Sequence, residues 1–263
     1  MAENRTFDPL ALRDLDKDDS ALKHVHVIGE GIRCGTEEVG YAKPGDRSDE
    51  EIVVDASEGF IPLWKPNVIL RWRFAVNTLA QFADPAAAGA AIESLLANAL
   101  LQWGDAAPIR FTKRDDDWDF EIEVKSSDDC NPVGCVLASA FFPDGGRHTL
   151  EIYPMLFRQD AAAQVTTLTH EIGHVFGLRH FFAKLKEAGE ASELFGEQNE
   201  FTIMNYGDKC RFTPQDKADL KRLYDLVWSG RLTAINKTPI HLVSPFHETP
   251  LSSGAFAVAA ARA

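Results

Sequence analysis

The sequence predicts a mixed α/β (α+β) fold, in which helices cover a twisted five-stranded mixed sheet. Three observations lead to this prediction. The chain of 263 residues is long enough to form a core, and its 45 % hydrophobic and 25 % charged residues are ordinary for a folded domain. No apolar run approaches the roughly 20 residues that a membrane helix needs. Strand-like and helix-like patterns follow one another along the chain, which is typical of helices layered on a sheet.

Five segments have the length and residue types of strands, and three have the period of helices. The clearest strand is 120–124, where Phe120, Ile122 and Val124 alternate with acidic residues. Thr213 is a typical N-cap for the last helix. The predicted strands are 68–74, 109–112, 120–124, 135–142 and 149–153, and the predicted helices are 85–103, 161–178 and 213–228.

We expect one folded domain over residues 61–229, between two segments of different character. Residues 1–60 contain 15 Asp and Glu against 7 Lys and Arg, and they show weak periodicity. We expect them to form an irregular acidic arm, packed along the domain. Residues 230–263 end in an alanine-rich stretch and are expected to form a loose C-terminal tail.

The charge of the chain argues against nucleic acid as a partner. The net charge is −13 and the pI is about 5.0, whereas affinity for nucleic acid rests on clustered Lys and Arg. Residues 1–10 lack the apolar stretch of a secretory leader. We therefore expect neither a nucleic-acid nor a membrane partner, and the location of the protein stays open.

The segment 169–180 contains a pattern of histidines that suits a metal ion. His170 and His174 are four residues apart, so on a helix both imidazoles leave the same face, as two ligands of one Zn²⁺ would. Gly177 permits a positive φ that ends the helix and returns His180 as a third ligand. Three protein ligands leave a fourth position for water, which is typical of a catalytic zinc site.

Glu171 lies beside the first histidine and is the predicted general base. It can accept a proton from a zinc-bound water and deliver it to a leaving amine. The pattern H-E-x-x-H alone also occurs in inert helices, but the added Gly177 and His180 make a chance match rare. The competing hypothesis is a zinc-binding protein without proteolytic activity, which would have no need of Glu171.

The eleven-residue pattern H-E-x-x-H-x-x-G-x-x-H of residues 170–180 is the signature of the metzincin metallopeptidases, which the sequence resembles. The segment 202–207 resembles the Met-containing turn beneath the zinc of that clan, with Met204 as the floor under the imidazoles. Tyr206 matches a tyrosine that astacin-like and serralysin-like members place near the metal. The resemblance implies that Tyr206 coordinates zinc at rest and stabilises the oxyanion during turnover.

Over about residues 61–228 the sequence resembles the matrixins in particular. The segment from Cys135 to Phe142 contains a stretch similar to their edge strand above the cleft, and 213–224 is similar to their last helix. The resemblance implies a metzincin-like zincin with 161–178 as its active-site helix. Because an edge strand has unpaired backbone groups, it also implies that an extended polypeptide substrate binds along 135–142.

The cysteines leave several alternatives open. The loop 125–135 lacks the histidines of the second, structural zinc site of matrixins, so that site is not expected here. Cys130 and Cys135 either close a short bridge in this loop or remain thiols. Cys34, in Arg-Cys-Gly, resembles the cysteine that blocks the zinc in matrixin zymogens, which would make the arm a prosegment. The alternatives are a bridge from Cys34 to Cys210 and a free thiol.

We therefore expect a zinc-dependent endopeptidase that hydrolyses extended polypeptides by Glu171-assisted attack of a zinc-bound water. The expected cofactor is one catalytic Zn²⁺. The acidic turn 115–119 offers oxygen ligands for Ca²⁺, although a solvated turn is the simpler interpretation. We expect a monomer, and the family resemblance favours secretion. The residue types do not identify the substrate.

Overall fold

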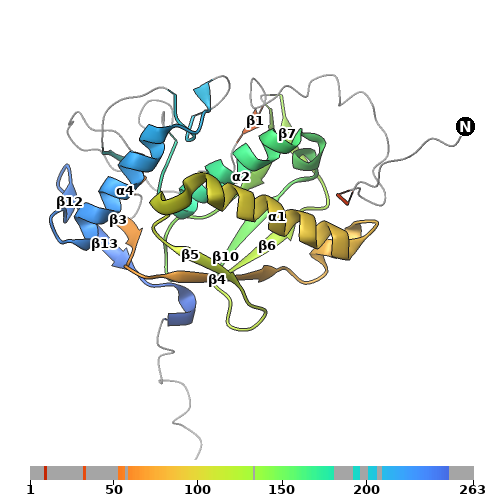
Figure 1. Ribbon diagram of the computed structural model, residues 1–263, viewed down its shortest axis with the longest axis horizontal. Coiled ribbons are helices and arrows are strands. Elements are labelled where there is room, and N and C mark those ends of the chain that lie inside the picture. Colours follow the sequence, from red (N-terminus) through yellow and green to blue (C-terminus); the bar gives the residue numbers. More distant parts are fainter. Residues whose placement is uncertain are drawn as a thin grey trace, which may run out of the picture.

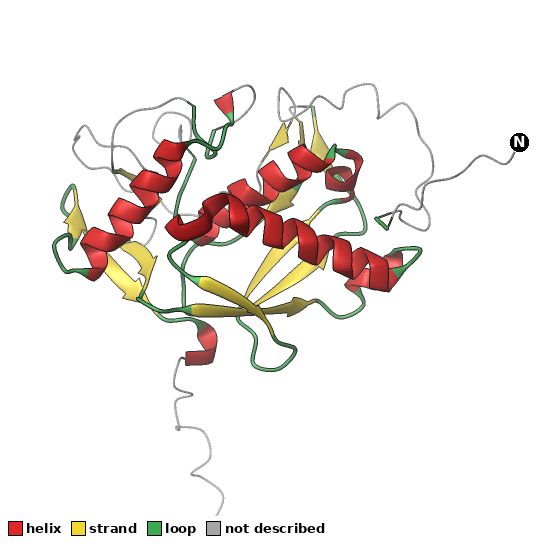
Figure 2. Ribbon diagram, viewed as in Figure 1, coloured by secondary structure: helices red, strands yellow, loops and turns green. Residues whose placement is uncertain are grey.

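The computed structural model describes residues 9–10, 32–33, 53–56, 59–132, 134–180, 192–195, 201–205 and 209–248. In this part of the chain, two long helices lie on one face of a five-stranded sheet (Figure 1). They are α1 (Pro85–Trp103) and α2 (Ala161–Val175), and they pack against each other. A third helix, α4 (Pro214–Trp228), lies beside them. Figure 2 shows the three helices in red and the sheet in yellow. The predicted fold class is confirmed.

The main sheet has the strand order β5-β4-β6-β10-β9. The first four strands are mutually parallel, and β9 is antiparallel to β10, so the sheet is mixed as predicted. Four of the five predicted strands lie within one residue of the observed bounds, and all three predicted helices are present. The strands are β4 (Ile69–Phe74), β5 (Arg110–Lys113), β6 (Phe120–Val124), β9 (Ala138–Ser139) and β10 (His148–Ile152).

Strand β6 shows why the two faces of the sheet differ. Phe120, Ile122 and Val124 are buried in the hydrophobic core, while the alternating residues between them face the other side. There Glu121 forms an ion pair with Arg73 on the neighbouring strand, at 2.7 Å. The alternation of the sequence thus sets which face the helices cover.

Each long helix begins at a polar side chain that caps its free N–H groups. Asp84 accepts hydrogen bonds from Ala86 N and Ala87 N at the start of α1. Asp160 accepts one from Ala163 N, at 2.8 Å, at the start of α2. The start of α4 is a capping box, described below. Short 3₁₀ turns occur at Thr78–Gln81, Gly104–Ala106, Pro154–Arg158 and Phe246–Glu248.

The prediction of one continuous strand over 135–142 is wrong. The segment is divided between β8 (Gly134–Val136), which forms a hairpin with β7 (Asp129–Asn131), and β9 in the main sheet. Three consecutive residues at the division, Val136, Leu137 and Ala138, are all buried, so the alternation of a strand is interrupted there. A disulfide between Cys130 and Cys135 closes the hairpin, which confirms the bridged alternative.

The prediction of a loose tail is wrong for residues 234–248. β12 (Ala234–Ile235) and β13 (Thr238–Val243) form a second sheet with β3 (Ile61–Trp64), in the order β12-β13-β3. β13 runs parallel to β3, and His247 is bonded to Asp119 through Nδ1, at 2.9 Å. Local patterns could not reveal a partner about 180 residues away. Residues 249–263 lie outside the described residues.

The end of the acidic arm belongs to the folded domain. β2 (Val53–Asp55) pairs with β11 (Ser192–Leu194), and Val54, fully buried, forms a bridge with Leu178. β1 (Ile32–Arg33) runs parallel to β8. The boundary at residue 60 stays a prediction; the described parts of the arm pair with β8, β11 and Leu178. No helix within the described residues is long and apolar enough to cross a membrane.

Candidate metal centre

Three buried histidines converge between the end of α2 and the turn that follows it. His170 and His174 lie on the helix, and His180 follows the turn. One ring nitrogen from each lies within 4.8 Å of the other two. The Nε2 atoms of His170 and His180 are 3.2 Å apart. The structure therefore brings together the three side chains that the sequence predicts as ligands.

Backbone carbonyls fix the orientation of two of the rings. His170 Nδ1 lies 2.7 Å from the carbonyl oxygen of Ile203, and His174 Nδ1 lies 2.7 Å from that of Leu178. A carbonyl can only accept, so each Nδ1 carries the proton and donates it. Each Nε2 therefore keeps a lone pair, which is the form of histidine that binds a metal.

The spacing of these nitrogens fits one tetrahedral ion. Two nitrogens that each lie about 2.05 Å from the same tetrahedral Zn²⁺ are roughly 3.3 Å apart. The separation between His170 and His180 is 3.2 Å, and lone pairs that face each other at this distance need a proton or a cation between them. A donor set of three imidazoles suits Zn²⁺ and not Ca²⁺, which prefers oxygen ligands.

The chain returns to the ligands through a glycine turn. Gly177 has φ +92°, its N–H donates to His174 O, and the N–H of Leu178 donates to Gly173 O. These two bonds form a Schellman motif, which ends a helix at a left-handed residue. A Cβ at Gly177 would lie 3.0 Å from Leu63 Cδ2 and 3.4 Å from Pro62 O. The predicted positive φ of Gly177 is confirmed; this conformation favours glycine, and a larger residue would also be tightly packed.

Side chains from other elements hold the end of α2. The indole Nε1 of Trp64 on β3 donates to Val175 O, at 2.7 Å, and the hydroxyl of Tyr224 on α4 donates to Phe176 O, at 3.0 Å. Trp103 on α1 donates to Thr169 O, at 3.1 Å. The carbonyls of Val175 and Phe176, at the end of the helix, thus have side-chain donors.

The turn 202–205 lies directly against α2. Met204 is buried, and a Cβ built on Gly173 would lie only 2.5 Å from its sulfur, so the methionine packs on the helix backbone between the two histidine ligands. Its neighbour Ile203 supplies the carbonyl that orients His170. This placement agrees with the expected floor beneath the imidazoles.

The other predicted residues have different outcomes. Glu171 is on α2 and is 2 % exposed, and its role as a base stays a prediction. Tyr206 and Cys34 lie outside the described residues. Cys210 forms no disulfide, so the alternative of a bridge to Cys34 is wrong; its thiol donates to Ile203 O, at 3.5 Å. Burial raises the pKa of this thiol to about 12.

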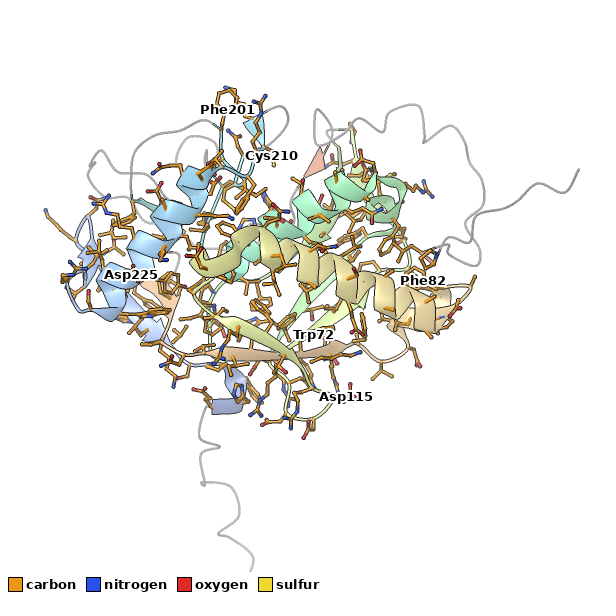
Figure 3. All side chains as sticks on the ribbon, in the orientation of Figure 1. Trp72, Phe82, Asp115, Phe201, Cys210 and Asp225 are labelled. Carbon is orange, nitrogen blue, oxygen red and sulfur yellow. A yellow bond between two sulfur atoms is a disulfide. The ribbon has the colours of Figure 1, made fainter. Side chains whose placement is uncertain are left out.

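The acidic turn 115–119 gives no support for Ca²⁺. Asp116 forms an ion pair with Arg114, and Asp117 forms one with Arg71. Asp119 accepts from Arg71 N, at 2.7 Å, and bonds His247. These carboxylates have protein partners. Figure 3 shows Asp115 at the opposite side of the molecule from Cys210, which lies beyond the start of α4.

Three residues near the centre were not predicted to make the contacts that the structure shows there. Phe142 packs edge-on against His174, with ring centroids 5.4 Å apart, and Arg179, which is 1 % exposed, lies 5.7 Å from the Phe142 ring. The pattern Thr-x-x-Asp at 213–216 is that of a capping box, which could have indicated a role for Asp216 at the helix start. Its contact with the turn 202–205 had no signal in the local sequence.

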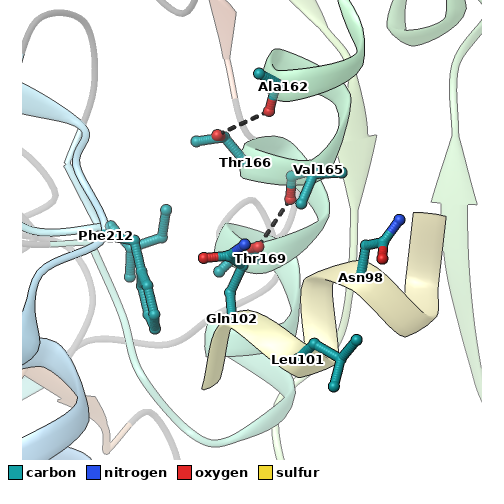
Figure 4. Close-up of a pocket in the computed structure, with 9 residues that line it drawn as sticks. Asn98, Leu101, Gln102, Ala162, Val165, Thr166, Thr169 and Phe212 are labelled. Carbon is teal, nitrogen blue, oxygen red and sulfur yellow. Dashed lines mark hydrogen bonds between the residues drawn. The ribbon is translucent and has the colours of Figure 1, made fainter. Parts of the chain in front are cut away.

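A hollow of about 430 Å³ lies between α1 and α2 (Figure 4). Thr169 and Ile203, which precede His170 and Met204, are part of its lining. The hydroxyl of Thr169 donates to Val165 O, at 2.8 Å, and is thus satisfied within the helix. The hollow is lined by Asn98, Leu101, Gln102, Ala162, Val165, Thr166, Thr169, Ile203 and Phe212.

Comparison with protein families identifies the segment that carries this site. Residues 64–186 match the family model of the matrixins, and this segment includes all three histidines. The chain carries a matrixin-like metallopeptidase domain. The match indicates that this segment is a zinc metalloendopeptidase domain of the metzincin type, and the predicted recognition is confirmed at this level. The tyrosine expected after the Met-containing turn of the matrixin-like domain stays a prediction.

Two solved structures are similar to the chain at low identity. One is high choriolytic enzyme 1, a hatching enzyme zinc-protease from Oryzias latipes, with 13 % identity over 62 % of this chain and 94 % of that chain, and a TM-score of 0.42. The other is myroilysin, with 11 % identity over 65 % of this chain and 98 % of that chain, and a TM-score of 0.41. A search of curated proteins gave no match to the chain.

Proposed function

We propose that the protein hydrolyses internal peptide bonds of extended polypeptides, with Glu171 as general base. The observation that supports this most is the convergence of His170, His174 and His180, whose nitrogens have the spacing of one zinc site. Three histidine ligands leave one position open, as catalytic zinc sites require. A site that only stabilised the fold would be closed by a fourth protein ligand.

The chain's own residues perform the proton transfers. A Zn²⁺ held by three imidazoles supplies Lewis acidity, which lowers the pKa of water toward 7 and polarises a carbonyl. Glu171, next to His170, accepts the proton of the attacking water and returns it to the nitrogen of the leaving amine. The buried surroundings of Glu171 exclude bulk water, which strengthens its interaction with a developing ammonium. Tyr206 is proposed to stabilise the oxyanion.

The substrate is proposed to bind along the edge of the main sheet. β9 is at that edge and pairs with β10 on one side, among the described residues. A polypeptide in extended conformation can bond with the free backbone groups of such a strand. Phe142, four residues beyond Ala138, contacts His174, so a chain bound at β9 continues toward the ligands.

The test combines metal content with cleavage of an unfolded protein. We expect one zinc per chain and cleavage that a chelator abolishes and added zinc restores. Glu171→Ala should keep the zinc and lose nearly all activity, because water loses its proton acceptor. Glu93→Ala is the matched control, since Glu93 lies on the exposed side of α1 in an ion pair with Lys113. Full activity of Glu171→Ala would refute the mechanism.

Zinc without cleavage would point to latency or to a binding role. Residues 1–60 are the proposed prosegment, and β1 within them lies beside β8, next to the proposed substrate strand. A chain that starts at Val53 separates the two cases, since Val54 belongs to the core and must be kept. Activity gained on truncation indicates latency, and continued inactivity indicates a binding protein.

A further inference from the structure

A carboxylate distant from the zinc ligands in sequence is bonded to the turn that orients one of them. Oδ1 of Asp216 accepts the hydroxyl proton of Thr202 and lies 3.4 Å from the N–H of Ile203, which points to it. The hydroxyl of Thr202 in turn accepts from Met204 N, at 3.2 Å. Three consecutive residues of the turn are thereby tied, directly or through one hydroxyl, to Asp216.

The other oxygen of this carboxylate faces the start of α4. Oδ2 of Asp216 accepts from the N–H of Thr213, at 2.6 Å, and from its hydroxyl, at 2.8 Å. The Thr213 hydroxyl also accepts from Asp216 N, at 3.2 Å, which completes a capping box. One side chain thus connects a helix start with the turn beneath the histidines.

The burial of the Asp216 carboxylate has an energetic cost that a solvent-exposed helix cap does not have. Burial raises the pKa of Asp216 despite its four hydrogen bonds, so the fold places a carboxylate where charge is unfavourable. A capping box on a solvated helix end would avoid this penalty. The bonds of Oδ1 to the turn give a reason for the position of Asp216.

The carbonyl of Ile203 links the turn to the metal centre. It accepts from His170 Nδ1, at 2.7 Å, and from the Cys210 thiol, at 3.5 Å. The N–H of the same residue points to Asp216, so the peptide units on both sides of Ile203 are fixed. The direction of this carbonyl sets the direction of the His170 ring, because a hydrogen bond to Nδ1 fixes where Nε2 points.

We propose that Asp216 is a positioning residue of the metal centre, which acts through Thr202 and Ile203 to aim His170 at the ion. The inference rests on the proposed function, in that it takes the three histidines as ligands. Asp216 touches neither the ion nor the substrate in this proposal. Its loss changes the geometry and the affinity of the site and leaves the set of ligands intact.

Two threonines of the chain provide a matched pair for the test. Thr202 and Thr213 each donate one hydroxyl bond to Asp216, and each accepts one backbone N–H bond at 3.2 Å. Replacement by valine keeps the shape and removes both bonds. Thr202→Val cuts the connection to the turn, whereas Thr213→Val cuts only the helix cap. A general loss of stability affects both variants, and a positioning effect only the first.

The experiment titrates the full chain, freed of metal, with Co²⁺ and records both the dissociation constant and the visible absorption bands of the bound ion. We expect Thr202→Val and Asp216→Asn to bind Co²⁺ about tenfold more weakly, with shifted bands, as for other residues that support a ligand. Thr213→Val should stay within about twofold of the unaltered chain, with unchanged bands, because Oδ1 keeps its partners. Thr202→Ser restores the hydroxyl and should restore both readings.

The possible outcomes separate this inference from the proposed function. If the unaltered chain binds no Co²⁺, the zinc site itself is refuted, and the inference with it. If the unaltered chain binds Co²⁺ and the two valine variants show equal affinity and equal bands, only the role of Asp216 is refuted. Unfolding curves of the metal-free variants show whether each is folded, and Thr202→Val, with its rescue by Thr202→Ser, gives the answer even if Asp216→Asn does not fold.

Discussion

Helices α2 and α4 end in the same way, yet only one of the two ends serves the metal centre. Gly177 and Gly230 both have positive φ, at +92° and +70°, and both follow the helix in a Schellman motif. Gly177 is packed against Leu63 and Pro62, whereas a Cβ at Gly230 would meet nothing within 4 Å. The same backbone motif is thus a simple stop on α4 and a tightly fitted part of the site on α2.

The difference lies in what the carbonyls of each turn do. At the end of α2, the carbonyl of Leu178 accepts from the ring of His174, so the residue after the glycine orients a ligand. At the end of α4, the equivalent residue is Arg231, which is exposed. Backbone hydrogen bonds therefore create the turn in both helices, and the additional bond between the Leu178 carbonyl and the His174 ring gives the turn after α2 its role.

The largest expected effect comes from alanine at the two glycines. Gly177→Ala should cost about 2–5 kcal/mol, as the sum of left-handed strain of about 1–2 kcal/mol and overpacking of about 1–3 kcal/mol. Gly230→Ala should cost only the strain, about 1–2 kcal/mol. Urea unfolding of both variants measures the difference. Equal costs would show that packing around Gly177 contributes nothing to its requirement for glycine.

The sequence pattern predicted the turn at the end of α2, but it did not predict the tertiary contacts around that turn. The histidine spacing and Gly177 lie within eleven residues, and helix period, caps and glycine conformation act over that range. The bounds of α1 and β6 were predicted without error for the same reason. Asp216 and Thr202 are 14 residues apart, and no periodic pattern in the sequence indicates that their side chains form a hydrogen bond.

The sequence pattern also failed to predict the pairing between distant strands. β13 pairs with β3 over a separation of about 180 residues, and both segments are short. The residues of a short strand do not identify it in the sequence, because strand propensity depends on the context that the partner strand supplies. The division between β8 and β9 has the same origin, because two different sheets pair with one continuous apolar segment.

The second expected effect is the stabilisation of the folded chain by zinc. The gain in unfolding free energy should differ between the two glycine variants. At a free zinc concentration of 100 times Kd, binding to the folded chain alone adds about 2.7 kcal/mol to the unfolding free energy. We expect this gain in the unaltered chain and in Gly230→Ala. In Gly177→Ala, where the third histidine is displaced, the same zinc concentration should add less than about 1 kcal/mol. Thermal unfolding with zinc and with chelator measures both gains.

A smaller effect is expected where α4 supports the end of α2. The buried hydroxyl of Tyr224 donates to Phe176 O and accepts from Trp64 N, so Tyr224→Phe leaves two buried backbone groups unsatisfied. We expect a loss of about 1–2 kcal/mol and weaker Co²⁺ binding. Tyr153→Phe is the matched control, because its hydroxyl donates to the side chain of Glu151 on β10 and not to a backbone group at the end of α2. If Tyr153→Phe weakens Co²⁺ binding as much, the support of α2 by Tyr224 is not specific.

The smallest expected effect is the pH dependence of the stability that Asp216 contributes at the start of α4. Burial raises the pKa of Asp216 in the folded chain above its ordinary value, so the folded state binds this proton more tightly than the unfolded state does. The stability that this carboxyl contributes is therefore full below its unfolded pKa and is lost as the pH rises through the folded pKa. The amide in Asp216→Asn does not titrate, and the titration of the histidines is common to the unaltered chain and the variant. The difference in unfolding free energy, unaltered chain minus variant, should thus fall between pH 4 and pH 7 in metal-free urea titrations, and a rise over that interval would contradict the raised pKa.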